Sequence, residues 1–202
     1  MKRRKVLLHA TVAVSLTAGC LSTSETSIET TTEPQQTNVE PEIKPLSQQP
    51  PDSDVDCSDE AMEPIDFLTR ESYPKRADDF ELTATTETVT IGDEITFSLR
   101  NVGTERNSVG TIYKYTFQRR EGDEWVPVYY TPNSGWIDDV NAIRPGGGYD
   151  WPFTFNQEGL ERENPGNADH YVCTPLEPGT YRFLYWGVGE EAIATRFTVE
   201  AP

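Results

Sequence analysis

The sequence predicts an all-β antiparallel sandwich in residues 57–202, built from about seven to eight strands. Short runs of alternating apolar and polar residues recur between turn signals, which is the pattern of half-buried strands. No long stretch has the 3.6-residue period of an amphipathic helix. A segment of this length fits one domain with one hydrophobic core.

Apolar residues at every second position mark the individual strands. In residues 94–100, Ile95, Phe97 and Leu99 face one way and polar residues face the other. Turns rich in glycine and proline separate these runs, as Leu176–Gly179 does before Tyr181. The strands predicted in this way are 80–84, 94–100, 111–120, 124–130, 149–155, 181–185 and 193–199.

Three parts of this pattern resemble a known family. The run Val89–Asn101, the stretch from Tyr115 to Val126 with its Gly122-Asp123 turn, and Leu176–Phe183 resemble immunoglobulin-like modules of prokaryotic surface lipoproteins. The resemblance covers roughly residues 80–200 and implies an immunoglobulin-like sandwich. Such modules serve in adhesion, as spacers or as binding domains, and their strand and turn signatures carry no chemistry.

Residues 1–20 have the composition of an export signal. A basic run at residues 2–5 precedes a modest apolar run from Val6 to Ala18, which is too short for a membrane-spanning helix of about 20 residues. Arg3 and Arg4 resemble the paired arginines of a twin-arginine export signal. The alternative is an ordinary basic segment in which two arginines happen to be adjacent.

The signal ends in Leu16-Thr17-Ala18-Gly19-Cys20, which resembles the lipobox of prokaryotic lipoproteins. The resemblance implies that the Cys20 thiol carries a membrane lipid and holds the protein at the extracellular face of the cell membrane. Thr17 departs from the family pattern, which usually has leucine at that place. The alternative is a simple secretory signal whose cysteine is incidental.

Residues 21–56 are rich in Ser, Thr, Pro, Glu and Gln and nearly lack apolar residues. Such a segment has too little apolar surface to offset the entropy of ordering, so we expect a disordered tether. Residues 57–79 are expected to be a lead-in segment tied to the domain, in which 59–70 form a short helix or irregular chain. The sandwich itself is expected at 80–202, with a long polar loop at 156–170.

The chain is strongly acidic, with 17 basic and 34 acidic residues and a net charge of −17. Four of the basic residues lie in the first 19 positions, so the chain from Cys20 onward has 13 basic and 34 acidic residues, or −21. Acid excess with few lysines resembles the composition of halophilic archaeal proteins. Molar salt shortens the screening length to about 3 Å, so the repulsion between the many carboxylates largely disappears. The alternative is an acidic surface for calcium or for a basic partner, and nucleic acid is disfavoured as a partner.

Once Cys20 carries lipid, Cys57 and Cys173 remain as an even pair in an exported protein, and we expect a disulfide between them. The alternative is two free thiols.

Catalytic and metal-binding signals are weak. His170 is the single histidine after the signal and is expected to be exposed in a polar loop, so a zinc site with two histidines is excluded by count. The carboxylates of Asp138-Asp139 or of Asp52–Asp56 lack the glycine and terminal glutamate of an EF-hand loop. We therefore expect no enzyme, no metal and no cofactor.

Aromatic residues are the remaining resource for binding. Trp136, Trp151 and Trp186 are candidates for a sugar- or peptide-binding face, although residues at strand parity also fit the core. The expected role is non-catalytic binding of an unidentified protein or glycan, adhesion or structural display. The alternatives are a protease-inhibitor-like β-sandwich module and an accessory domain of a secreted hydrolase.

Overall fold

The computed structural model describes residues 40–51, 55–58, 61–189 and 192–202. The predicted export signal with Arg3, Arg4 and Cys20, and most of the predicted tether, lie outside the described residues. No helix among the described residues is long and apolar enough to cross a membrane.

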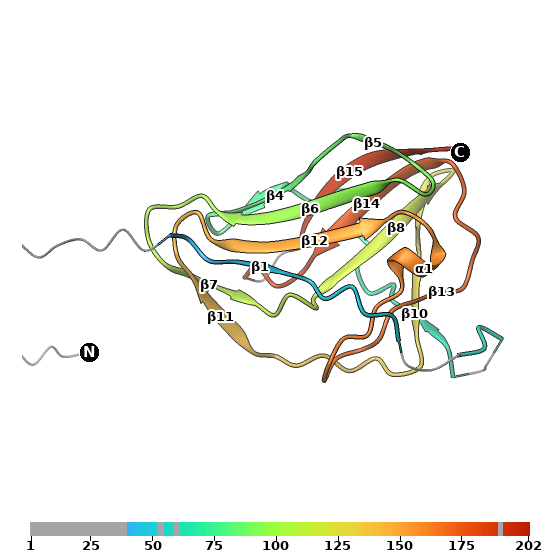
Figure 1. Ribbon diagram of the computed structural model, residues 1–202, viewed down its shortest axis with the longest axis horizontal. Helices are drawn as coiled ribbons and strands as arrows, with labels where there is room; N and C mark the ends of the chain where they lie inside the picture. The colour runs from blue at the N-terminus through green and yellow to red at the C-terminus, as the bar shows by residue number, and fades with distance from the viewer. Residues whose placement is uncertain (1–39, 52–54, 59–60, 190–191) are drawn as a thin grey trace, which may run out of the picture. The chain divides into compact units, whose positions relative to one another are not determined.

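The first sheet of the sandwich has the strand order β1-β12-β6-β4-β3 (Figure 1). Its antiparallel centre consists of β12 (Gly148–Thr154), β6 (Glu94–Asn101) and β4 (Phe80–Ala84). The edge strand β1 (Ile43–Pro45) runs parallel to β12, and β3 (Arg76–Ala77) pairs with β4.

The second sheet has the strand order β5-β15-β14-β8-β9. Its strands β15 (Ile193–Glu200), β14 (Gly179–Tyr185) and β8 (Tyr115–Glu121) are antiparallel neighbours. The hairpin partner β9 (Glu124–Pro127) and the parallel strand β5 (Thr88–Thr90) form its two edges.

This arrangement is that of an immunoglobulin-like sandwich. In the lettering of that fold, β4, β6 and β12 take positions A, B and E of one sheet. The other sheet has β5, β15, β14, β8 and β9 at positions A′, G, F, C and C′. The predicted fold class is confirmed, with eight strands at sandwich positions.

Smaller elements lie outside the two main sheets (Figure 1). A three-stranded sheet joins β13 (Tyr171–Val172), β10 (Tyr129–Thr131) and β2 (Glu63–Pro64). A two-stranded ribbon pairs β11 (Val140–Ile143) with β7 (Asn107–Gly110), and α1 spans Gln157–Leu160.

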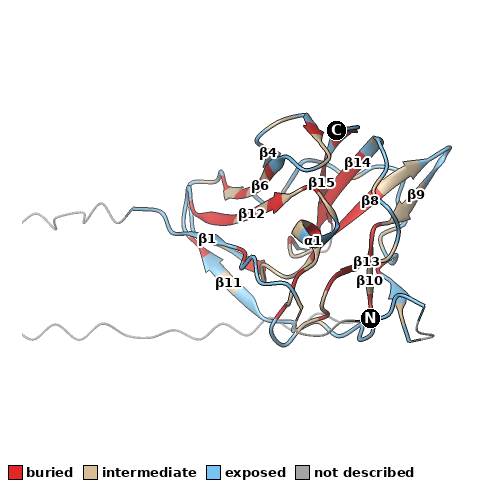
Figure 2. Ribbon diagram, turned by 45° about the vertical axis from the view of Figure 1, so that its right-hand side comes forward, coloured by how far each residue is buried: buried red, intermediate tan, exposed pale blue. Residues whose placement is uncertain are grey.

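Buried residues lie on the strands of both sheets (Figure 2), and many of those in the core are aromatic. The Phe97 ring on β6 stacks on the Phe183 ring on β14, with centroids 4.4 Å apart and planes 12° from parallel. Phe97 also contacts Phe117 and Phe197, at 5.4 and 5.2 Å. Burying one such side chain stabilises the fold by about 1.5–3 kcal/mol, so this aromatic layer holds the two sheets together.

The prediction of a disordered tether is wrong at residues 43–46. Residues 43–45 form β1, and the Leu46 side chain is only 3% exposed. The Leu46 amide donates to the Asp150 carbonyl at 2.7 Å, which extends the pairing with β12. The composition of residues 21–56 did not predict this strand because the open edge of β12, which supplies its hydrogen bonds, lies about 100 residues further along the chain.

The helical alternative for 59–70 is wrong over its described part. Residues 63–64 form β2, and the chain from Ile65 to Arg70 is irregular. A neighbouring strand binds this stretch at Ile65, whose amide donates to the Tyr129 carbonyl at 2.9 Å.

The predicted disulfide is confirmed between Cys57 and Cys173, whose Cα atoms are 5.3 Å apart. It joins the lead-in segment to the residue that follows β13, across a sequence separation of 116.

We expect the double variant Cys57→Ser/Cys173→Ser to lose about 2–5 kcal/mol of unfolding free energy, because the bridge restricts a long loop of the unfolded chain. Denaturant unfolding of the variant and of the oxidised protein measures the difference. Equal midpoints and slopes for the two proteins would contradict a stabilising bridge.

The prediction that His170 is exposed is wrong. Its side chain is fully buried, stacked on Tyr129 at 4.4 Å and edge-on to Tyr115 at 4.6 Å. Burial, assisted by the charge of Arg162, lowers the pKa of His170 to about 3 from an ordinary value of 6.5. The loop composition did not predict the burial of His170, because that burial depends on how residues 161–172 pack against the core.

A neutral buried histidine makes stability depend on pH. Below pH 6.5 the unfolded chain binds a proton at His170 that the folded chain does not bind. The contribution of neutral His170 to the unfolding free energy is therefore complete above pH 6.5 and is lost as the pH falls toward 3. We expect a slope of up to about 1.4 kcal/mol per pH unit from this residue. Denaturant unfolding of wild type and His170→Gln between these pH values measures it. An identical slope in the variant would exclude His170 as the source.

Candidate binding site at the loop end of the sandwich

Three connections lie together at one end of the sandwich, since β6 ends and β8 and β12 begin there. They are the B–C connection at residues 102–114, the stretch 132–147 that leads into β12, and the F–G connection that follows Tyr185. Pairing of Gly148 with Arg100 and of Tyr185 with Tyr115 fixes this end of each sheet. In immunoglobulin variable domains the B–C and F–G loops of this end bind antigen.

Polar tips of core aromatic residues hold the B–C connection. The hydroxyls of Tyr149 and Tyr185 both donate to the Gly110 carbonyl, at 2.9 and 2.8 Å. The Trp151 indole N–H donates to the Ile112 carbonyl at 2.8 Å. The strand predicted from residue 111 therefore begins at Tyr115, because residues 111–114 turn to meet these donors.

The B–C and F–G connections touch each other through two glycines. The Gly110 amide donates to the Gly187 carbonyl at 2.7 Å. A Cβ atom at position 187 would lie 2.2 Å from the Tyr185 hydroxyl oxygen, so only glycine permits this approach. The two connections therefore form one joined surface.

An exposed aromatic cluster lies at this end, made of Phe67, Trp136 and Trp186. Ring centroids are 5.5 Å apart for Phe67–Trp136, 4.9 Å for Phe67–Trp186 and 5.6 Å for Trp136–Trp186. All three pairs are edge-to-face, with interplanar angles of 66°, 87° and 86°. Phe67 is 50% exposed, while both tryptophans are half-buried against the core.

The structure separates the predicted aromatic face into two parts. Trp136 and Trp186 come together, but Trp151 is fully buried in the core on β12, so its place on a binding face is wrong. Phe67 was missed, because it lies in a lead-in segment with no strand periodicity. The sequence shows it only as an aromatic residue between Asp66 and Leu68, with no sign of a surface role.

The geometry shows what kind of ligand the aromatic cluster fits. Centroid separations of 4.9–5.6 Å leave no room for a ligand between the rings, which excludes an aromatic cage. The exposed parts of the rings offer apolar surface instead, with Phe67 half exposed and both tryptophans partly buried. Ile137 and Val140, which follow Trp136 in the chain, are 40% and 71% exposed and add apolar area.

Carboxylates accompany the aromatic cluster. Lys114 forms an ion pair with Asp138 at 2.7 Å, and this hydrogen bond lowers the pKa of the Asp138 carboxyl. Asp139 and Asp66 are exposed beside Trp136–Asp138 and Phe67 in the chain. The Lys114 pairing occupies one oxygen of the calcium candidate Asp138-Asp139, and no cluster of three or more metal-ligating side chains occurs in the described part of the chain.

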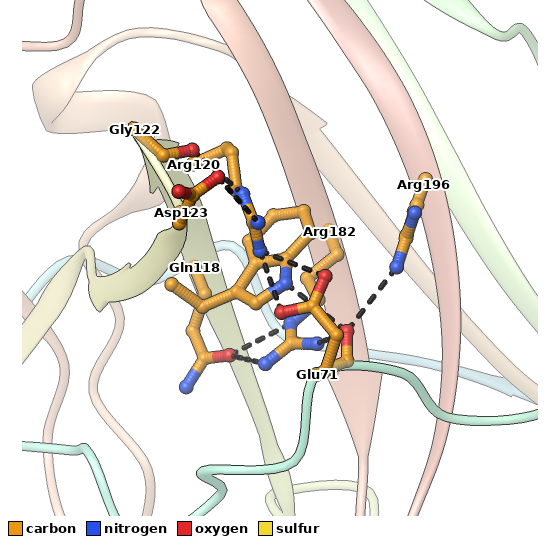
Figure 3. A network of polar contacts seen from close by, with 8 residues as sticks. Glu71, Gln118, Arg120, Gly122, Asp123, Arg182 and Arg196 are labelled. Atoms are coloured by element: carbon orange, nitrogen blue, oxygen red, sulfur yellow. Dashed lines mark hydrogen bonds and ion pairs between the residues drawn. The ribbon is translucent and has the colours of Figure 1, made fainter.

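Side chains of the second sheet hold the segment that carries Phe67 by donating to its backbone carbonyls (Figure 3). The Gln118 side-chain amide donates to the Leu68 carbonyl at 2.9 Å. The Glu71 carbonyl accepts from Arg182 at 3.1 Å and from Arg196 at 3.2 Å. These donors stand on β8, β14 and β15, so three strands position one irregular segment.

The Glu71 side chain completes this network (Figure 3). Its carboxylate accepts from Arg120 at 2.9 and 2.7 Å, and these hydrogen bonds hold the pKa of Glu71 below its usual value. The Arg182 guanidinium lies 4.2 Å from the Trp125 ring centroid. Burial lowers the pKa of Arg182 to about 10, which still leaves it charged at neutral pH and able to hold the segment.

Comparison with known proteins assigns no family. No family model matches this sequence, and no curated protein matches it. Solved structures that share local likeness include a β-glucosidase from Listeria innocua, at 12% identity over 61% of this chain and 16% of that one, with a TM-score of 0.30. A β-glucosidase from Erythrobacter marinus shows 16% identity over 60% of this chain and 15% of that one, with a TM-score of 0.29.

The chain thus spans about a sixth of the length of those enzymes. At these TM-scores the likeness supports no statement about fold or activity.

Proposed function

We propose that this chain is a lipid-anchored cell-surface protein whose immunoglobulin-like domain binds its ligand non-catalytically through the aromatic cluster Phe67, Trp136 and Trp186. One observation carries the proposal. Three segments far apart in the sequence bring large aromatic side chains to one exposed place at the loop end of the sandwich. The hydrogen bonds of Gly110 and Leu68 hold two of the surrounding segments in place before any ligand arrives.

The lipid anchor rests on the sequence, with support from the disulfide. Cys57 and Cys173 bridge each other, which leaves Cys20 as the third cysteine of the chain. Its position after Ala18-Gly19 at the end of the apolar run fits lipidation and retention at the extracellular face of the membrane. Arg3 and Arg4 fit export by the twin-arginine route.

The acidic composition bears on how binding is driven. If the protein works in molar salt, charge attraction between partners is screened within about 3 Å, whereas apolar burial persists. Tryptophan side chains dominate the energetics of many protein interfaces, and truncating one costs about 2 kcal/mol or more. A surface of exposed aromatic and aliphatic side chains therefore fits a protein or glycan partner under these conditions.

The anchor is tested by Cys20→Ser, which we expect to move the protein from the membrane fraction into the medium. The control is Cys57→Ser/Cys173→Ser, which removes the two disulfide cysteines, leaves Cys20 in place and should keep membrane retention. Fractionation followed by immunoblotting measures both. Unchanged membrane retention of Cys20→Ser would reject Cys20 as the lipid anchor.

The binding surface is tested with the Cys20→Ser protein, used as a soluble probe of isolated cell envelopes in molar salt. We expect saturable binding that weakens about 30-fold, or about 2 kcal/mol, in Trp136→Ala and in Trp186→Ala. Val126→Ala on β9, at the other end of the second sheet, is the matched apolar control, and circular dichroism checks that each variant is folded.

Equal binding by folded tryptophan variants and the control would reject the aromatic cluster as the contact surface. Protease inhibition by the same soluble protein would favour the inhibitor-like alternative. Turnover of glycan or ester substrates would favour the hydrolase alternative.

A further inference from the structure

Arg106 and Arg144 differ from the other arginines that the structure describes. Each of the others has a hydrogen bond, an ion pair or a ring contact for its guanidinium group. The side chains of Arg106 and Arg144 have none of these among the described residues. Both are exposed, and they lack a counter-charge in a chain that has 34 acidic and 17 basic residues.

The two arginines line the same hollow, which has a volume of about 320 Å³ and lies beside the edge strand β1 (Figure 1). The ribbon of β7 and β11 and the residues next to it contribute Arg106 and residues 141–144. The chain that leads into β1 contributes Glu40, Glu42 and Lys44. No residue of the aromatic cluster lines this hollow, so it is distinct from the surface that is proposed above to bind the ligand.

The buried side chain of Asn101 holds the backbone on which both arginines stand. Its Nδ2 atom donates to the carbonyls of Glu105 and Ile143, each at 2.9 Å. These residues directly precede Arg106 and Arg144, so one amide group brings the two peptide segments together. The backbone of the site is therefore fixed before a ligand arrives, which lowers the entropy cost of binding.

The other charged side chains of the hollow do not neutralise the two arginines. Lys44 pairs with Glu42, with 3.8 Å between the Nζ atom and a carboxylate oxygen. Glu40 is the remaining carboxylate, and it forms no ion pair with a described residue. The lining side chains thus carry three positive and two negative formal charges. This local excess of positive charge favours an anionic ligand.

The shape of the donors indicates which anion fits. A guanidinium group is a planar fork, and the two oxygens of one carboxylate are fully used by one such fork. A phosphate group has further oxygens and accepts from two forks at once. We propose that Arg106 and Arg144 bind a phosphate group in this hollow.

The position of the hollow offers a source of phosphate. Glu40, which lines it, follows Cys20 by 20 residues, and a flexible chain of that length spans about 25 Å on average. Headgroup phosphates of the membrane that holds Cys20 are therefore within reach. This lipid source rests on the anchor of the proposed function, whereas a small phosphate compound in solution is a source that does not depend on it.

The test uses the Cys20→Ser protein in molar salt, which screens non-specific charge attraction. In the first arm, calorimetric titration with inorganic phosphate should show saturable binding. In the second arm, the protein should float with vesicles of phosphatidylglycerol in a neutral glycolipid and not with vesicles of the glycolipid alone.

Arg106→Met and Arg144→Met should each weaken binding at least about tenfold, because each variant loses charge-assisted hydrogen bonds. Both side chains are exposed, so we expect both variants to fold, and circular dichroism checks this. The matched control is Lys75→Met, which removes an exposed positive charge outside the hollow and should bind as the parent does.

Binding of inorganic phosphate without flotation would assign the site to a small phosphate compound in solution. Equal binding by the two arginine variants and Lys75→Met would overturn the proposal, as would the absence of saturable binding of both probes to the folded protein. Stronger binding of acetate than of phosphate would also overturn it. Neither arm needs a lipid on the protein, so failure of the phosphate site is separate from failure of the anchor, which is read from the membrane retention of the chain with Cys20 intact.

Discussion

The stack of Phe97 on Phe183 joins the two sheets, and the rest of the molecule depends on the aromatic layer around it. The same layer reaches outward, because Tyr149, Tyr185 and Trp151 lie in the core with their rings and hold the B–C connection with their polar atoms. The packing of the core therefore also determines the position of the B–C connection. A change that shifts these rings disturbs the candidate binding surface as well as the stability of the sandwich.

Segments that precede the sandwich complete it. Strand β1 covers the open edge of β12, and the disulfide joins Cys57 to Cys173, the residue after β13. The segment around Phe67 lies across the second sheet, where arginine and glutamine side chains bind its carbonyl groups. These additions give the immunoglobulin-like module a surface that its eight sandwich strands alone lack, since Phe67 comes from outside them.

Two arginines have structural roles inside a strongly acidic chain. Arg182 and Arg162 are both buried, and each is surrounded by aromatic rings and carbonyl groups. Arg182 shares its neighbourhood with the Glu71 carboxylate, whereas Arg162 has only neutral acceptors in the described part of the chain. Arg182 therefore helps to fix the segment that carries Phe67.

The strand pattern, the turns and the pairing of Cys57 with Cys173 were predicted from the sequence alone, because they follow from residue period, turn chemistry and the two cysteines left once Cys20 is assigned to lipid. The sequence also singled out Trp136 and Trp186. Only the tertiary structure decided that Trp151 is core, that Phe67 joins the two tryptophans, that residues 43–45 form a strand, and that His170 is buried beside Arg162. Each of these depends on contacts between residues far apart in the chain, and local composition carries no information about such contacts.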